Sequence, residues 1–223
     1  MVVISGLQGM TETFDVLIVG GGSAGAVLAN RLSEGNARRV MLLEAGSAYS
    51  PNLYPPDLAN ADIVAGPDGH DWGYVGATGI SDRSIRAPRG KALGGSSAVN
   101  AGVAIRAREA DFAKWSALGI QGWSFDDVLA SYKAVENSPD GDDRYRGRSG
   151  PLPIRTRRRD ELTPSLNAFI DAADNQGFAR VADFNGAEQA GVGPYPSPSF
   201  PAAASTPASP SSMMAFAPAR IVR

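Results

Sequence analysis

Two glycine-rich stretches are the residues of this chain best suited to bind a ligand. The first is Gly-Gly-Gly-Ser-Ala-Gly at residues 20–25, and the second is Gly-Lys-Ala-Leu-Gly-Gly-Ser-Ser at residues 90–97. Backbone N–H groups in such loops can approach a phosphate closely, because no side chain stands between them and the anion. These stretches therefore favour the binding of a phosphate-containing ligand.

The first stretch lies inside a pattern typical of a dinucleotide site. Residues 14–19 are an apolar run with the length of a buried parallel strand, and residues 39–44 are a second one. Between them, residues 23–34 place apolar side chains on one helical face, and a glycine then ends the helix. Strand, turn, helix and strand in this order predict a βαβ unit.

In such a unit each glycine has a separate task. We expect Gly20 to allow the tight exit from the strand, Gly22 to admit a pyrophosphate, and Gly25 to let the helix pack closely on the sheet. Glu44 ends the second apolar run, where a carboxylate accepts hydrogen bonds from ribose hydroxyls and repels a 2′-phosphate. A glycine-rich turn that binds nothing is the alternative.

Composition excludes several classes of function. The chain has 223 residues, a net charge of −2, no cysteine and a single histidine. Disulfides and thiolate metal sites are therefore excluded, and no charge excess favours nucleic acid or an anionic membrane. The acidic loop at 140–143 lacks the spacing of a calcium site, the basic run at 155–159 is typical of a solvated strand end, and no metal site is expected. With short apolar runs and no basic leader, a cytoplasmic location is the default expectation.

Residues 90–100, which extend the second stretch through Ala-Val-Asn, closely resemble a signature of the glucose–methanol–choline (GMC) family of FAD-dependent oxidoreductases. The likeness continues through residues 101–103, 111–115, 122–129 and 191–195, so that it spans nearly everything from residue 13 to residue 196. The resemblance implies an α/β fold: a Rossmann-like FAD-binding domain, incomplete here, with the start of a substrate domain. It also implies an alcohol substrate whose hydride passes to flavin N5, and a separate electron acceptor.

The resemblance assigns cofactor-binding roles position by position. Residues implied to bind the pyrophosphate and the adenosine ribose are Gly20, Gly22, Ser23, Ala24, Gly25, Glu44 and Ala45. Residues implied to lie along the rest of the cofactor are Gly90, Lys91, Leu93, Gly94, Gly95, Ser97, Asn100, Ala101, Gly102 and Val103. Trp72 resembles an aromatic residue near the cofactor, and a core tryptophan is an equal alternative. Some relatives carry a histidine that bonds covalently to the flavin where this chain has Val99, so FAD is expected to bind non-covalently.

No residue of the chain matches the catalytic histidine of the resemblance, which comes from a segment near the end of a chain more than twice as long. His70 precedes the second stretch and is expected to be a solvated loop residue. The chain is therefore expected to be weakly active or inactive. A non-catalytic stub that binds FAD or ADP, an NAD-dependent dehydrogenase fragment, and an interaction protein without cofactor remain alternatives.

We expect four segments along the chain. Residues 1–12 form a flexible lead, 13–150 the FAD-binding part, 151–196 the beginning of a substrate-binding domain, and 197–223 a low-complexity Ser/Pro/Ala tail. Residues 197–212 are expected to be disordered, and a frameshift would explain the composition of the tail. Residues predicted to be helical are 108–118, 125–136 and 163–177; residues 151–156 are predicted to form a strand, and 45–89 to be mostly irregular.

Overall fold

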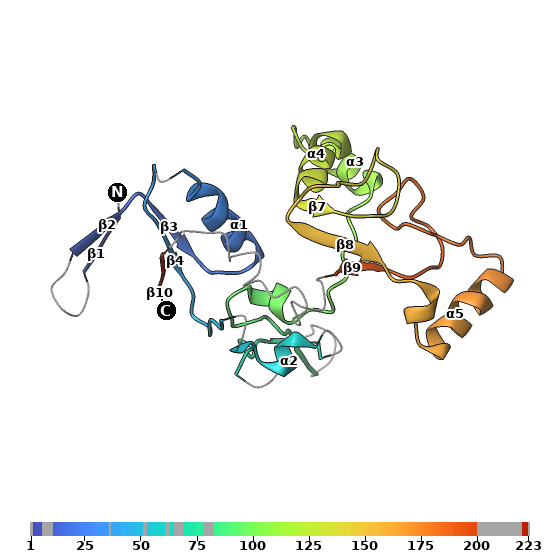
Figure 1. Ribbon diagram of the computed structural model, residues 1–223, viewed down its shortest axis with the longest axis horizontal. Helices are drawn as coiled ribbons and strands as arrows, with labels where there is room; N and C mark the ends of the chain where they lie inside the picture. Colours follow the sequence, from blue (N-terminus) through green and yellow to red (C-terminus); the bar gives the residue numbers. More distant parts are fainter. Residues whose placement is uncertain are drawn as a thin grey trace. The chain divides into compact units, whose positions relative to one another are not determined.

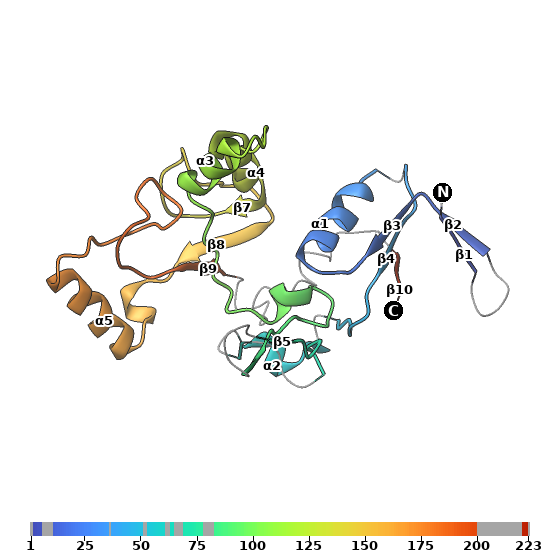
Figure 2. The same ribbon diagram turned by 180° about the vertical axis from the view of Figure 1, so that it is seen from behind.

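The computed structural model describes residues 2–5, 11–35, 37–50, 53–60, 63–64, 69–77, 83–199 and 220–222. The chain divides into two compact units, which are treated separately below (Figures 1 and 2). The first unit is Met1–Gly102 with Pro201–Arg223, and the second is Val103–Phe200. Within the described residues, no helix is both long enough and apolar enough to cross a bilayer.

A parallel three-stranded sheet forms the centre of the first unit. Strands β3 (Val16–Val19) and β4 (Val40–Leu43) pair in parallel, and β10 (Arg220–Val222) pairs with the other edge of β4. Helix α1 (Ser23–Leu32) connects β3 to β4 and lies against this sheet (Figure 1). The predicted βαβ unit is therefore confirmed.

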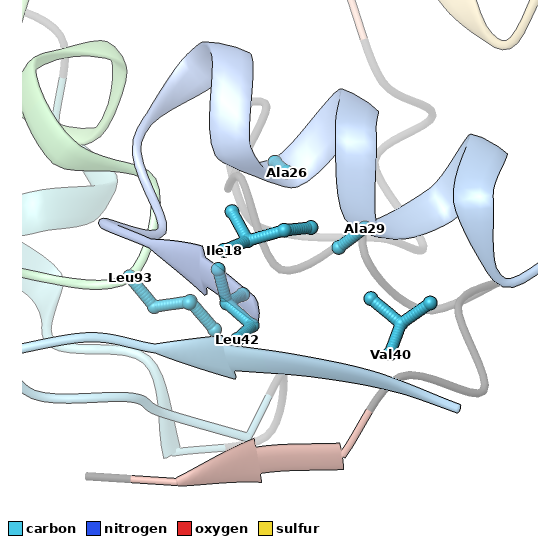
Figure 3. Packing of buried hydrophobic residues seen from close by; sticks show 6 residues of the cluster. All are labelled: Ile18, Ala26, Ala29, Val40, Leu42 and Leu93. Atoms are coloured by element: carbon cyan, nitrogen blue, oxygen red, sulfur yellow. The ribbon is translucent and has the colours of Figure 1, made fainter. Parts of the chain in front are cut away.

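Small side chains on α1 let the helix approach the sheet. Ala26 and Ala29 face Ile18, Val40 and Leu42 across the interface, and all five side chains are buried (Figure 3). A sixth member of this cluster, Leu93, comes from the second glycine stretch and is 7% exposed. The second stretch is thus anchored by a side chain in the core beneath the first.

The remaining described parts of the first unit are short. The element bounds are β1 (Val2–Ser5), β2 (Thr11–Phe14), α2 (Pro56–Ala59), β5 (Val75–Ala77), β6 (Ser84–Arg86) and the 3-10 helix η2 (Gly95–Ala98). Strands β1 and β2 pair antiparallel, so the described parts of the lead that was expected to be flexible lie in paired strands. Residues 45–89, expected to be mostly irregular, contain a second antiparallel pair, β5 with β6.

The second unit contains three helices and a small mixed sheet. The element bounds are α3 (Glu109–Ala117), α4 (Phe125–Val135), β7 (Glu136–Asn137), β8 (Leu152–Thr156), the 3-10 helix η3 (Arg159–Glu161), α5 (Pro164–Asn175) and β9 (Pro196–Pro198). Sheet order is β7-β8-β9. The Ser124 hydroxyl accepts from Asp127 N, and Ser124 N donates to the Asp127 carboxylate, as the capping box at the start of α4 predicts.

Buried charges connect separate segments of the second unit. The Glu136 carboxylate lies 2.5 Å from one guanidinium nitrogen of Arg106 and 3.2 Å from one of Arg146. Arg146 also lies 3.5 Å from the carboxylate of Asp183. Burial lowers the pKa of Arg106, and the charge of Glu136 opposes that shift. Removing one partner would leave the others buried without compensation, so this cluster must form as a whole.

The start of the expected tail is ordered, which corrects the prediction of disorder there. Ser197 pairs with Arg155 as part of β9, and the Arg155 side chain donates to the Ser199 hydroxyl at 3.0 Å. Backbone pairing with β8 supplies the order that the apolar content could not, and the prolines are tolerated because β9 is an edge strand. Residues 200–212, on which the rest of that prediction falls, lie outside the described residues.

We expect Gly25→Ala to destabilise the first unit even though alanine has the higher helix propensity. A Cβ at Gly25 would lie 1.9 Å from the carbonyl oxygen of Gly20, so the helix would have to move away from the sheet. The free energy of unfolding in urea should fall by about 2 kcal/mol. Gly22→Ala is the control, because its Cβ meets only Gly95 Cα at 3.9 Å. Equal stability of the two variants would contradict the packing argument.

Candidate dinucleotide-binding site

The first glycine stretch leaves the sheet where β3 and β4 both end. Gly20 adopts φ of +93°, which favours glycine, and its N–H donates to Leu43 O at 2.8 Å. Gly22 then caps α1 without any side-chain hydrogen bond, and the first turn of the helix carries no acidic residue. The helix therefore begins with N–H groups that no side chain satisfies, at the partially positive end of its dipole.

Glu44 holds the chain on both sides of this turn. Its Oε2 accepts from Gly21 N at 2.6 Å, and its Oε1 accepts from Gly46 N at 2.7 Å. The side chain is nearly buried at the carboxyl end of β4. An ionised carboxylate has about four acceptor positions, so each oxygen retains capacity for one further donor. Ribose hydroxyls are donors of the kind that this position suits.

The second glycine stretch lies directly against the first. Gly94 N donates to Gly21 O at 2.7 Å, and Gly94 forms a parallel bridge with Gly22. Gly94 and Gly95 adopt φ of +103° and +55°, so both occupy the region that favours glycine. The two stretches predicted from their sequences to bind one ligand are therefore in backbone contact.

Internal hydrogen bonds define the conformation of the second stretch. Gly90 N donates to the Ser96 hydroxyl at 3.1 Å, and the Ser97 hydroxyl donates to Gly94 O at 2.6 Å. A Cβ at Gly90 would lie 2.2 Å from Gly95 O, so the loop returns on its own backbone. The hydroxyl of Ser97 is thus engaged within the loop in this structure.

Open space lies where the two stretches meet the uncapped end of α1. A Cβ at Gly20 would meet nothing within 4 Å, and one at Gly22 would meet only Gly95 Cα at 3.9 Å. At Gly25 and Gly90, by contrast, the space is filled by backbone. A side chain at Gly22 would project into this open space, next to the unsatisfied N–H groups. The residues present therefore fit the diphosphate of a dinucleotide.

The other predicted site residues have different surroundings. Lys91 Nζ lies 4.9 Å from the centroid of the Trp72 ring, and Trp72 is 44% exposed, so the alternative of a core tryptophan is wrong. Asn100 Oδ1 accepts from Gly102 N at 2.9 Å in an exposed turn. Four further predicted residues are exposed: Ser23 and Ala24 in the first turn of α1, Ala45 and Ala101. Val103 is half-exposed and begins the second unit.

His70 is not the solvated loop residue that the sequence led us to expect. Its Nε2 lies 2.7 Å from the hydroxyl of Tyr49, and the centroids of the two rings are 5.7 Å apart. Tyr54 packs edge-on against Tyr49, and burial together with the charge of Tyr49 raises the pKa of Tyr54. Sequence reasoning missed both tyrosines, because they lie in a stretch without periodicity; their only signal is aromatic character between two glycine motifs.

The charged segments of the second unit are structural. The Arg148 guanidinium donates to the carbonyls of Ser138, Asp140 and Gly141 and to the Asp143 carboxylate, so it occupies the centre of the acidic loop. No metal-binding cluster of His, Cys, Asp or Glu occurs in the described part of the chain. In the basic run, Arg155 forms a bidentate pair with Glu161, which lowers the pKa of that carboxyl to about 2.

The sequence matches the model of the GMC oxidoreductase family over residues 14–205. The chain belongs to the GMC oxidoreductase family. It is similar to the oxygen-dependent choline dehydrogenase of Rhizobium rhizogenes, with 41% identity over 182 residues, and to that of Vibrio vulnificus, with 37% identity over 187 residues. These matches cover 80% and 83% of this chain but 32% and 33% of the two dehydrogenases.

Solved structures of GMC flavoenzymes share the fold. Pyridoxine 4-oxidase from Mesorbium loti superposes with a TM-score of 0.74 at 37% identity, over 83% of this chain and 36% of that one. A formate oxidase superposes with a TM-score of 0.76 at 25% identity, over 94% and 38%. The chain thus has the α/β fold of the N-terminal, FAD-binding part of the family and spans about a third of the length of its relatives.

We expect Glu44→Gln to destabilise the first unit, because one of its two backbone N–H partners would face an amide NH₂ group and lose its acceptor. The free energy of unfolding in urea should fall by about 1–3 kcal/mol. Glu34→Gln is the matched control, since among the described residues Glu34 forms only an exposed pair with Arg31. If the two substitutions have equal effects, the carboxylate of Glu44 does not organise the turn.

Proposed function

We propose that this chain binds FAD non-covalently and is the cofactor-binding part of an oxidoreductase that acts on the CH–OH group of a small alcohol. One observation carries the proposal: both glycine stretches meet at the uncapped, open N-terminal end of α1. A single turn with a free helix end fits many anions. Two such stretches in backbone contact form a longer surface, as an extended dinucleotide requires.

The chain's own residues would bind and orient the cofactor. Gly20, Gly22 and the first residues of α1 would hold the diphosphate, and Glu44 the adenosine ribose. Residues of the second stretch from Gly90 to Ser97, continued by 100–103, would extend along the rest of the molecule. Bound FAD would supply the hydride acceptor for oxidation of the alcohol. We also propose that the FAD-binding part comprises residues 13–150 and that a substrate domain begins at residues 151–196.

The alcohol substrate is proposed from the relatives. Two curated relatives are oxygen-dependent choline dehydrogenases, and a structural relative is a pyridoxine 4-oxidase. A small primary alcohol, with choline as the first candidate, is therefore the substrate class to test, with a separate electron acceptor. An NAD-dependent dehydrogenase is supported by the first stretch and Glu44 alone, and that alternative leaves the contact between the two stretches without a role.

FAD should stabilise the purified chain against thermal unfolding more than NAD does, because a ligand stabilises the state it binds. Gly22→Ala should raise the Kd for FAD at least about tenfold while leaving the unfolding temperature of the apo protein unchanged, because the added methyl occupies the open space and touches no core atom. Flavin fluorescence titration measures the Kd.

Acid precipitation tests the mode of binding, and FAD should appear in the supernatant. Val99, at the position where the family resemblance implies a covalent histidine, has no nucleophilic atom and is buried beside Leu58 and Ala98. Flavin that remains with the precipitate would contradict non-covalent binding. Stabilisation by NAD but not by FAD would instead favour the dehydrogenase alternative.

The 223-residue chain loaded with FAD should not oxidise choline. Proton removal from an alcohol needs a base, and the one histidine of the chain is hydrogen-bonded to Tyr49. Anaerobic addition of choline should therefore leave the visible absorbance of the bound flavin unchanged, with dithionite as the positive control for reduction. Bleaching by choline at a rate above that of free FAD would show that the chain has its own base.

A further inference from the structure

The beginning of the second glycine stretch lies between two extended segments of the first unit. On one side Lys91 N donates to His70 O at 2.7 Å. On the other side Leu93 N donates to Ser47 O at 2.8 Å. Two isolated β-bridges join the same segments: an antiparallel bridge between Asp71 and Gly90, and a parallel bridge between Ser47 and Ala92. The stretch is therefore the middle member of a three-segment backbone ladder.

The flanking segment that follows Glu44 approaches this middle member very closely. A Cβ at Gly46 would lie 2.2 Å from the carbonyl carbon of Lys91 and 2.3 Å from Ala92 N. Only glycine permits this approach. A small shift of either flanking segment is therefore transmitted directly to the backbone that ends at Gly94 and Gly95, where the two stretches meet.

One side-chain hydrogen bond joins the two flanking segments to each other. It links the Tyr49 hydroxyl with His70 Nε2 at 2.7 Å, and neither residue belongs to a glycine stretch. The Tyr49 ring also packs against the cluster of Leu58, Ala98 and Val99, whose last two members lie at the end of η2. Tyr49 is thus bonded to the segment before the second stretch and packed against a cluster that includes residues after it.

We propose that Tyr49 and His70 form a positioning pair that holds the second glycine stretch in the conformation that binds the dinucleotide. This inference rests on the proposed FAD site. Consecutive glycines with positive φ have many conformations when they are unrestrained, and their ordering opposes binding. A link between the two flanks restricts the stretch before the ligand arrives, so its loss should weaken binding without removing any group that touches the ligand.

The second ring nitrogen of His70 supplies a discriminating test. In the described structure Nδ1 is buried and has no hydrogen-bond partner, so the ring acts through Nε2 alone. Glutamine places its amide near the position of Nε2, and asparagine places it near that of Nδ1. His70→Gln should therefore keep the link to Tyr49, whereas His70→Asn should lose it at similar polarity.

The test compares Tyr49→Phe, His70→Asn and His70→Gln, with Tyr74→Phe as control. The Tyr74 hydroxyl makes no hydrogen bond within the described residues, so its removal breaks no link. Hydrogen exchange of the amides of Lys91, Leu93 and Gly94 is measured in the apo protein, and the Kd for FAD by fluorescence. Tyr49→Phe and His70→Asn should each raise the exchange rate of these amides and the Kd for FAD about fivefold. This factor corresponds to the net ~1 kcal/mol of one hydrogen bond.

His70→Gln and Tyr74→Phe should behave as wild type in both measurements, and the double variant Tyr49→Phe/His70→Asn should be no worse than either single one. Unchanged exchange in Tyr49→Phe and His70→Asn would overturn the inference. Faster exchange at the α1 amides as well would also overturn it, because that result indicates general destabilisation. An unchanged Kd for FAD despite faster exchange of the second stretch would overturn it too. If wild-type protein binds no FAD, the proposed function is wrong, and the exchange measurement alone decides whether the pair holds the stretch.

Discussion

The backbone contact between the two glycine stretches is the constraint on which the first unit depends. Gly94 N donates to Gly21 O, and glycine suits both positions: a Cβ at Gly21 would lie 2.8 Å from Leu93 Cδ1, and Gly94 adopts a φ of +103°. Leu93, immediately before Gly94, is buried against α1 and the sheet, so the contact is supported by the core (Figure 3). Packing and binding geometry are therefore coupled: the residue that anchors the second stretch is part of the core that α1 and β3 form.

Local features of this unit were predictable from sequence, and contacts between irregular segments were not. The apolar runs and the helical face of α1 repeat with the periods of regular structure, so their elements follow from spacing alone. The steric tasks expected of Gly20 and Gly25 agree with the structure for a related reason, because a strand-to-helix turn imposes known steric demands. Tyr49 and His70 lie 21 residues apart in a segment without periodicity, and no local pattern relates them. Their contact depends on where the flanking segments are placed, which is a property of the folded chain.

The second unit shows the same limit for charged residues. A single arginine or glutamate is most often exposed, so nothing in the sequence marks Arg106, Glu136 and Arg146 as interior residues. In the structure Glu136 pairs with both arginines, and Asp183, beside Arg146, supplies the second negative charge. Asn185 completes the arrangement by accepting from Arg106 N and donating to Ala104 O. Such groups are tolerated inside only when each has partners. Their burial is thus a collective property, which residue-by-residue reasoning cannot reach.

The glycines of a motif are usually treated as one signal, yet this structure separates two physical causes within a single turn. At Gly25 a side chain would collide with backbone, so glycine is required by packing whether or not a ligand binds. At Gly22 φ is −72° and a methyl group has room, so neither conformation nor packing requires glycine. What remains to explain Gly22 is the open space beside the uncapped end of α1. The role that remains for Gly22 is the proposed one, close approach of a diphosphate, which is the group that this helix end and the adjoining loop suit.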